Sequence, residues 1–79
     1  MAARRPSRIR WTEHASAKAD LLSVSRVDVE DAVLEHHNRR TENTGAADWR
    51  VAVGRLVVAY DYPHHDDELT ARVVTLWRA

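Results

Sequence analysis

WRVAVGRLVVAY, residues 49–60, is the stretch that decides the fold of this 79-residue chain. Two apolar runs flank Gly54-Arg55, a two-residue hairpin signal of type II′ character because glycine comes first. The predicted hairpin pairs three sets of residues on one apolar face: Val53 with Leu56, Val51 with Val58, and Trp49 with Tyr60. We expect helices that precede the hairpin to cover this face.

The segments around the hairpin predict further strands. Arg39–Thr44 is a candidate strand before a turn at Gly45-Ala46-Ala47, and Leu69–Arg78 follows a turn at Pro63–Asp67 as a long last strand. Both phases of the last strand contain apolar residues, so we expect it to be covered on both sides. The outer face of the hairpin carries Arg50, Ala52, Val57 and Ala59. Its apolar residues predict a partner or dimer contact, or a terminal segment folded over them.

Two helices are predicted before the hairpin. Thr12 is a good N-cap for a helix that runs to about Leu22, where Ser23-Val24 ends it. Ser25 is expected to cap a second helix in a capping-box arrangement with Asp28. The apolar stripe of this second helix has i, i+3, i+4, i+7 spacing, and the helix ends near residues 36–38; the stripe is Val29, Ala32, Val33 and His36.

These elements predict an α+β fold in which two N-terminal helices pack on an antiparallel β-meander of about four strands, with Arg8–Trp11 as a candidate short extra strand. Residues 1–7 are expected to form a flexible basic tail, and residues 8–79 a single small domain. The chain has no cysteine, which excludes disulfides and thiolate metal sites. It has neither a membrane-length apolar run nor an apolar signal core, so we expect a cytoplasmic protein with no membrane partner.

Charge is unevenly distributed although the formal net charge is zero. Residues 1–12 hold four arginines and no acid, whereas residues 13–38 hold six acids against Lys18 and Arg26. Eleven of the twelve Lys and Arg residues are Arg, the side chain suited to bidentate recognition of phosphate or carboxylate. Overall neutrality argues against tight non-specific binding of nucleic acid, but a local basic face remains open.

His14 and Lys18 lie one turn apart in the middle of the broad apolar arc predicted for the first helix. A cationic side chain directed inward is costly unless it pairs, reaches solvent or lines a cleft. One interpretation is a site for phosphate binding or acid–base chemistry, since histidine exchanges a proton near neutral pH. The other is a histidine packed against Trp11, with Lys18 extending to solvent.

Several arginines lie in or beside neighbouring predicted strands: Arg50, Arg55, Arg72 and Arg78. Together they would hold an RNA backbone and stabilise charge at a scissile phosphate, or they are ordinary surface residues in weak ion pairs with nearby acids. His36-His37 and His64-His65 do not have spacing that requires their convergence, so we predict no metal site and no cofactor. The roles of these four histidines stay open.

A family resemblance rests on Trp11-Thr12-Glu13-His14-Ala15, Lys18, and the later Val24-Ser25, Asp28-Val29 and Ala32, with Arg55–Tyr60 and Val73–Trp77 as strands. This pattern resembles a family of small bacterial proteins of unassigned function that is similar to RelE/ParE and BrnT-type toxins of toxin–antitoxin pairs. The resemblance covers most of residues 9–77, and His14-Ala15 is its most diagnostic pair. The chain differs from those toxins in being neutral rather than strongly basic.

The resemblance implies a toxin-like protein that acts as a metal-independent endoribonuclease, with an antitoxin partner. It implies His14 as the acid–base group, Lys18 and Arg72 as catalytic phosphate contacts, and Arg55 and Tyr60 among the RNA contacts; Arg50 and Arg78 extend that RNA-binding set. The outer sheet face would bind the antitoxin or a second copy of the chain. The alternative is a non-catalytic homodimeric interaction module that retains the toxin-like fold.

Overall fold

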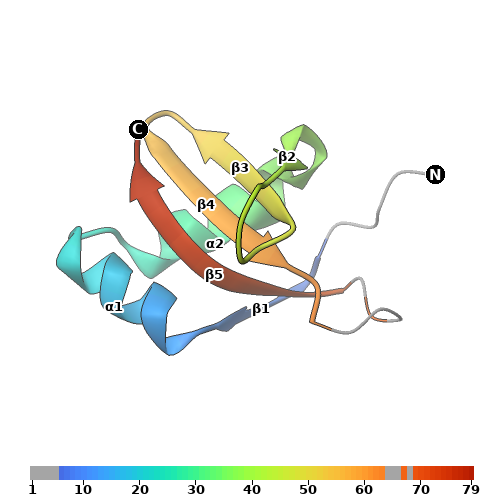
Figure 1. The fold of residues 1–79 in the computed structure, drawn as a ribbon, viewed down its shortest axis with the longest axis horizontal. Coiled ribbons are helices and arrows are strands. Elements are labelled where there is room, and N and C mark those ends of the chain that lie inside the picture. The colour runs from blue at the N-terminus through green and yellow to red at the C-terminus, as the bar shows by residue number, and fades with distance from the viewer. Residues whose placement is uncertain (1–5, 64–66, 68) are drawn as a thin grey trace.

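The computed structural model describes residues 6–63, 67 and 69–79, and has an α+β fold with two α-helices and one five-stranded mixed sheet. The elements in chain order are β1 (Arg8–Trp11), α1 (Glu13–Leu21), α2 (Arg26–His36), the 3₁₀ helix η1 (His37–Arg39), β2 (Thr41–Glu42), β3 (Trp49–Val53), β4 (Leu56–Asp61) and β5 (Thr70–Arg78). The sheet order is β1-β5-β4-β3-β2, with α2 behind it in Figure 1. None of the described helices is long and apolar enough to cross a membrane.

The central hairpin confirms the predicted register. Val51 pairs with Val58, and the other two predicted pairs also form between β3 and β4. Gly54 has a φ of 61°, the positive value that the first position of a type II′ turn requires and that glycine adopts without strain.

The first strand changes the predicted topology from an antiparallel meander to a mixed sheet. β1 is a full member of the sheet and pairs in parallel with β5, placing Arg10 opposite Arg72. The backbone N–H groups of Ser7 and Arg8 both donate to the Leu69 carbonyl, and Pro6 is fully buried. Residues 6 and 7 therefore belong to the folded domain rather than to a tail, and residues 1–5 of the predicted tail lie outside the described residues.

A β-bulge in β5 explains why both phases of this strand contain apolar residues. Ala59 pairs with Thr75 but the next residue, Tyr60, pairs with Val73, so Val74 has no opposite residue on β4. The extra residue shifts the alternation, and both Val73 and Leu76 therefore belong to the core on the helical side. The bulge alone therefore accounts for the apolar residues in both alternations of β5, and this pattern does not require that both sides of the strand are covered.

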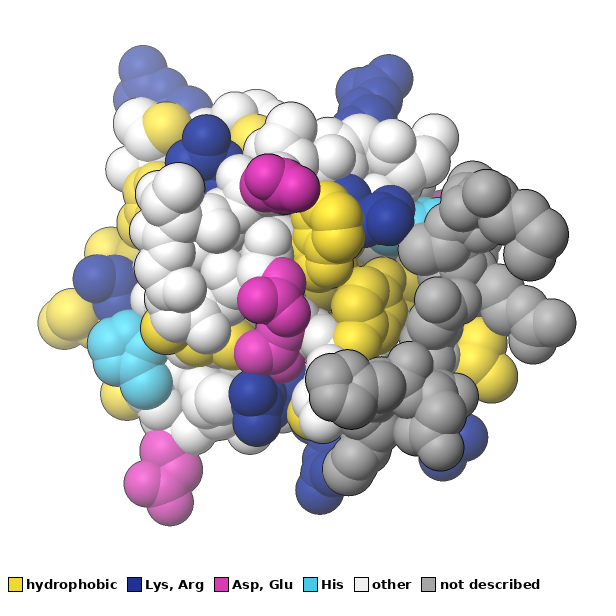
Figure 2. All heavy atoms as spheres, turned by 45° about the vertical axis from the view of Figure 1, so that its right-hand side comes forward, with side chains coloured by type: hydrophobic (Ala, Val, Ile, Leu, Met, Phe, Trp, Pro, Cys, Tyr) yellow, Lys and Arg dark blue, Asp and Glu magenta, His cyan; other side chains and the backbone are white. Residues whose placement is uncertain are grey.

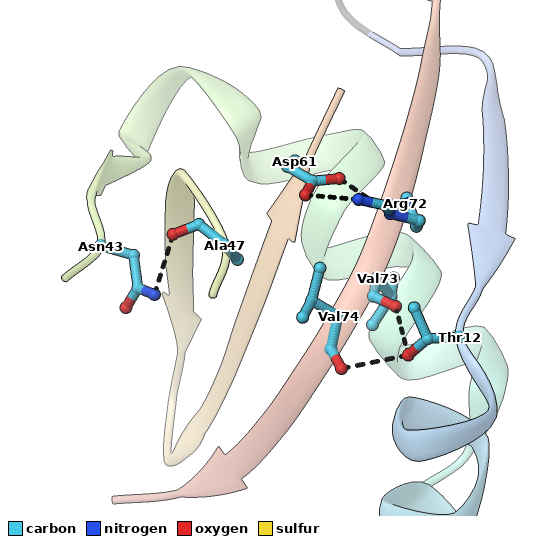
Figure 3. A network of polar contacts seen from close by, with 7 residues as sticks. All are labelled: Thr12, Asn43, Ala47, Asp61, Arg72, Val73 and Val74. Carbon is cyan, nitrogen blue, oxygen red and sulfur yellow. Dashed lines mark hydrogen bonds and ion pairs between the residues drawn. The ribbon is translucent and has the colours of Figure 1, made fainter. Parts of the chain in front are cut away.

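Thr12 connects the start of α1 to the bulge. Its hydroxyl accepts a hydrogen bond from the Ala15 N–H at 3.1 Å, as the N-cap prediction requires. The same hydroxyl lies 3.2 Å from the Val73 carbonyl and 3.1 Å from the Val74 carbonyl (Figure 3). Ser25 is also an N-cap, but its side chain makes no capping hydrogen bond, so the predicted capping box is wrong.

The core lies between the helices and one sheet face. It is built from small and β-branched residues, with Tyr60 and Leu76 as the largest fully buried side chains. In α1 the buried residues are Ala15 and Ala19, whose small side chains let the helix pack closely on β5. Leu21 is 77% exposed, so the buried side of α1 is narrower than the predicted arc and is centred away from His14.

The loop between β2 and β3 covers part of the outer face, which is the sheet face opposite the helices. β2 is shorter than the predicted strand at both ends, because η1 includes Arg39 and because Asn43 and Thr44 belong to the loop. The loop crosses in front of the sheet in Figure 1 and is held by the Asn43 side-chain amide, which donates to the Ala47 carbonyl at 3.1 Å (Figure 3). Ala47 and Ala59 are both buried outside the main core. Among the described residues, an internal loop therefore provides this cover.

Candidate functional site

Several arginines lie on the outer face, although the formal net charge of the chain is zero. In β1 the alternation directs Ile9 and Trp11 to the core, and Arg8 and Arg10 to the outer face, where both are exposed. Arg72 of β5 and Arg50 of β3 belong to the same face by register. The helices on the opposite side carry six carboxylates against two cations: Glu13, Asp20, Asp28, Glu30, Asp31 and Glu35 against Lys18 and Arg26. Among the described residues, arginines therefore gather on the outer face and carboxylates on the two helices.

A row of residues crosses the outer face and ends at His14. Thr41, Arg50, Ala59 and Thr75 are successive register partners on β2, β3, β4 and β5. The Arg50 Nε donates to the Thr41 hydroxyl at 3.4 Å, and at the other end His14 Nε2 lies 3.0 Å from the Thr75 hydroxyl. Neighbouring strands are about 4.8 Å apart, so the backbones of Arg50 and Thr75 are separated by roughly 10 Å. This row brings a titratable imidazole to the edge of the arginine-bearing face.

His14 is exposed, and its position corrects the first prediction for α1. Its ring nitrogen is near the Thr75 hydroxyl, whereas the Trp11 indole N–H donates to Glu30 at 2.9 Å and Arg26 stacks on the Trp11 ring. Lys18, one turn further along α1, is half-buried. Neither side chain is in the middle of the buried side of α1, because that side follows the alanines. The exposed imidazole can reach a ligand from solvent.

Arg72 is held in place by a carboxylate. Its Nε and Nη2 donate to the two oxygens of Asp61 at 3.1 and 2.9 Å, a bidentate pair across β4 and β5 (Figure 3). These hydrogen bonds and the Asp61 charge raise the pKa of Arg72 above its ordinary value. The Arg72 side chain is still 43% exposed, whereas that of Asp61 is 10% exposed. Figure 2 shows Lys or Arg side chains beside Asp or Glu side chains on the side of the molecule that it draws, and the Arg72–Asp61 pair is one such neighbouring pair in the structure.

A cleft of about 450 Å³ lies on the outer face and shares Thr41 and Arg50 with the row that ends at His14. It is lined by Arg39, Thr41, Arg50, Ala52, Val57, Trp77 and Ala79. Ala52, Val57 and Trp77 are register partners across β3, β4 and β5, which gives the cleft an apolar floor and an aromatic side. The sequence places Trp77 in the last strand but does not identify it as a site residue. The bulge determines that Trp77 lies on the same face as Arg50, and the bulge cannot be seen in the sequence of β5 alone.

The other predicted arginines lie elsewhere. Arg78 Nη2 donates to the Leu22 carbonyl at 3.0 Å, and Arg55 lies in the turn between β3 and β4. Both line a separate cleft of about 340 Å³ that includes Ser23 and Asp28 of the helical side. They therefore do not join Arg50 and Arg72 on the outer face.

Tyr60 is unsuited to RNA contact because it is fully buried on the helical side of β4. Burial raises the pKa of its hydroxyl well above the ordinary value, and the neighbouring Tyr62 adds to this shift. The two rings meet edge to face with centroids 6.0 Å apart. Tyr60 is a core residue, and we withdraw it from the RNA-binding set.

The described residues contain no group of three or more His, Asp or Glu side chains that could hold a metal ion. His36 and His37 lie at the junction of α2 and η1, where both are half-buried. His64 and His65 and most of the predicted turn at Pro63–Asp67 lie outside the described residues. Comparisons with protein-family models, with curated proteins and with solved structures found no match to this chain.

Proposed function

We propose that this chain binds RNA on the outer face of its sheet, as the toxin-like component of a bacterial toxin–antitoxin pair, and cleaves it without a metal ion. The observation that carries the proposal is the row from Thr41 and Arg50 to Thr75 and His14, on the face that also holds Arg10 and Arg72. Arginines on one face can hold successive phosphates, and an exposed histidine beside them can transfer a proton.

In the proposed reaction the ribose 2′-hydroxyl attacks the adjacent phosphate. His14 removes the 2′-proton as the bond from the 2′-oxygen to phosphorus forms and the bond from phosphorus to the 5′-oxygen breaks. The imidazolium then returns a proton to the departing 5′-oxygen, which leaves a 2′,3′-cyclic phosphate and a 5′-hydroxyl. Thr75 orients the ring through its hydroxyl, and Lys18 and Arg72 stabilise the charge that develops on the phosphate.

The test is cleavage of a labelled single-stranded RNA, together with the growth of a bacterial host in which the chain is expressed. His14→Ala should abolish cleavage and toxicity while the variant keeps the wild-type circular dichroism spectrum. His36→Ala, a histidine on the helical side at the edge of a separate groove, is the matched control and should act like the wild type. A wild type that neither cuts RNA at any salt concentration nor slows growth would overturn the enzymatic proposal.

A second candidate is a non-catalytic module that forms a homodimer through the outer face. Two observations favour it: Asp61 occupies the bidentate side of Arg72, and Ala52, Val57 and Trp77 make an apolar strip on that face. Light scattering after size-exclusion chromatography separates the two candidates. A dimer that Ala52→Glu converts to a monomer, with no RNA bound, would support the module.

A further inference from the structure

Trp77 lines the outer-face cleft and differs from the other two tryptophans in the cations that surround its ring. The chain has three tryptophans, and arginines already stack on two: Arg26 lies 5.0 Å from the Trp11 ring centroid and Arg40 lies 4.5 Å from that of Trp49. Across the described residues no arginine or lysine stacks on Trp77, which is half-buried along the outer-face cleft. Within the part of the chain that the structure describes, no cation therefore occupies the aromatic surface of Trp77.

The lining of the cleft matches the two chemical parts of a nucleotide. Ala52 and Val57 provide an apolar floor beside the indole, which suits the apolar face of a base. Arg50 and Arg39 lie on the side towards β2, where a phosphate attached to that base can be bound. No Asp or Glu side chain is among the described residues that line the cleft, in contrast to the groove on the helical side, which Asp28, Asp31 and Glu35 line. The volume of about 450 Å³ is within the range of about 300–1,000 Å³ typical of ligand sites.

We propose that Trp77 stacks on an unpaired base of the bound RNA, so that this site selects single-stranded over double-stranded RNA. This inference rests on the RNA-binding function proposed above and adds to it a residue that sets strand preference. A base within a duplex is stacked and paired on both sides, whereas an unpaired base can turn into the cleft and expose its ring to the indole. Arg50 contributes through charge, and its effect does not depend on the strandedness of the RNA.

The experiment compares the binding of one fluorescently labelled RNA decamer, single-stranded or annealed to its complement, by fluorescence polarisation. Trp77→Ala should weaken binding of the single strand by about 5- to 150-fold, the loss that removal of one stacked base corresponds to, and should change duplex binding by less than about 2-fold. Trp77→Phe keeps an aromatic ring and should recover most of the affinity. Arg50→Ala should weaken both forms, and Arg26→Ala, which removes an equal charge from the helical side, should weaken neither strongly.

Intrinsic fluorescence gives a second measurement that does not depend on affinity. The single strand should quench tryptophan emission of the wild type, and Trp77→Phe should remove that quenching although Trp11 and Trp49 remain.

The outcomes separate this inference from the proposed function. If the wild type binds both RNA forms and Trp77→Ala leaves the single-strand affinity unchanged, or weakens both forms equally, base stacking at Trp77 is overturned while RNA binding stands. If no RNA binds at low salt, the proposed function fails, and this inference fails with it. If Trp77→Ala only converts a dimer to a monomer, the outer cleft is a protein interface and not a nucleotide site.

Discussion

Replacing Asp61 with Asn should lower the stability of the fold and at the same time strengthen RNA binding. Asp61 is 7% exposed, and its two oxygens accept hydrogen bonds of 3.1 and 2.9 Å from Arg72. Asn retains one oxygen acceptor and loses the charge, so the guanidinium is freed in part. If stability falls while RNA affinity rises, Arg72 binds phosphate and Asp61 restrains it. A residue that only supports the sheet would lower stability without raising the affinity.

The magnitudes follow from the exposure of the pair. A hydrogen bond to a charged group contributes about 1.5–3 kcal/mol, and solvent screening of the 43%-exposed Arg72 reduces the value for this pair to about 1 kcal/mol. For a domain of this size that corresponds to a fall in Tm of roughly 4–8 °C. One additional phosphate contact to single-stranded RNA should steepen the plot of log affinity against log salt by about 0.7.

The assays are thermal unfolding by circular dichroism and RNA binding at several salt concentrations. Asp20→Asn is the matched control, because it removes the same charge from an exposed position on α1 without freeing an arginine. It should leave the Tm and the salt slope close to those of the wild type. If Asp61→Asn weakens RNA binding together with stability, or leaves the salt slope unchanged, Arg72 is a structural residue and its place in the proposed site is refuted.

Two further predictions concern the framework that holds the site. Thr12→Val removes the hydroxyl that caps α1 and reaches the bulge carbonyls, so it should lower the free energy of unfolding by about 1–2 kcal/mol, measured with urea, whereas Thr12→Ser should stay close to the wild type. Hydrogen bonds from the Thr70 hydroxyl and the Leu69 N–H lower the pKa of Asp67 from its ordinary 3.8. Ionised Asp67 therefore stabilises the fold fully at pH values above the ordinary pKa of 3.8, which applies to the unfolded chain. This stabilisation is lost as the pH falls through the lower pKa of the folded state. Asp67→Asn should reduce the loss of Tm on acidification below about pH 4, and an unchanged acid profile would show that other carboxylates dominate it.

The central hairpin could be predicted from sequence because its information is local. A glycine that tolerates positive φ fixes the turn, and strict alternation then fixes which residues face the helices. The same holds for Thr12, where one residue type at a helix start satisfies a backbone N–H three residues later. In both cases the deciding contacts lie within a few residues of each other.

The parts that could not be predicted depend on contacts between distant segments. The parallel pairing of β1 with β5 joins residues about sixty positions apart, and no periodicity within Arg8–Trp11 identifies its partner. The bulge at Val74 is defined by the register with β4, so neither phase of β5 alone indicates that Thr75 and Trp77 share the face of Arg50. For His14 the error came from helix packing, since Ala15 and Ala19 allow close approach to β5 and leave the imidazole outside.

These nonlocal contacts also change the argument from charge. Neutrality along the chain was an argument against nucleic-acid binding, but binding depends on the field at one face and not on the sum over the molecule. Because β1 lies beside β5, Arg8 and Arg10 from the basic N-terminal segment lie on the same sheet face as Arg72, while the acids of residues 13–36 are on helices across the sheet. In the proposed function, this separation would orient the outer face towards the RNA, and the acidic helices would disfavour the reverse orientation. The double substitution Arg10→Ala and Asp20→Ala removes one cation from the outer face and one carboxylate from the helical side. It should therefore weaken RNA binding although the total charge stays at zero.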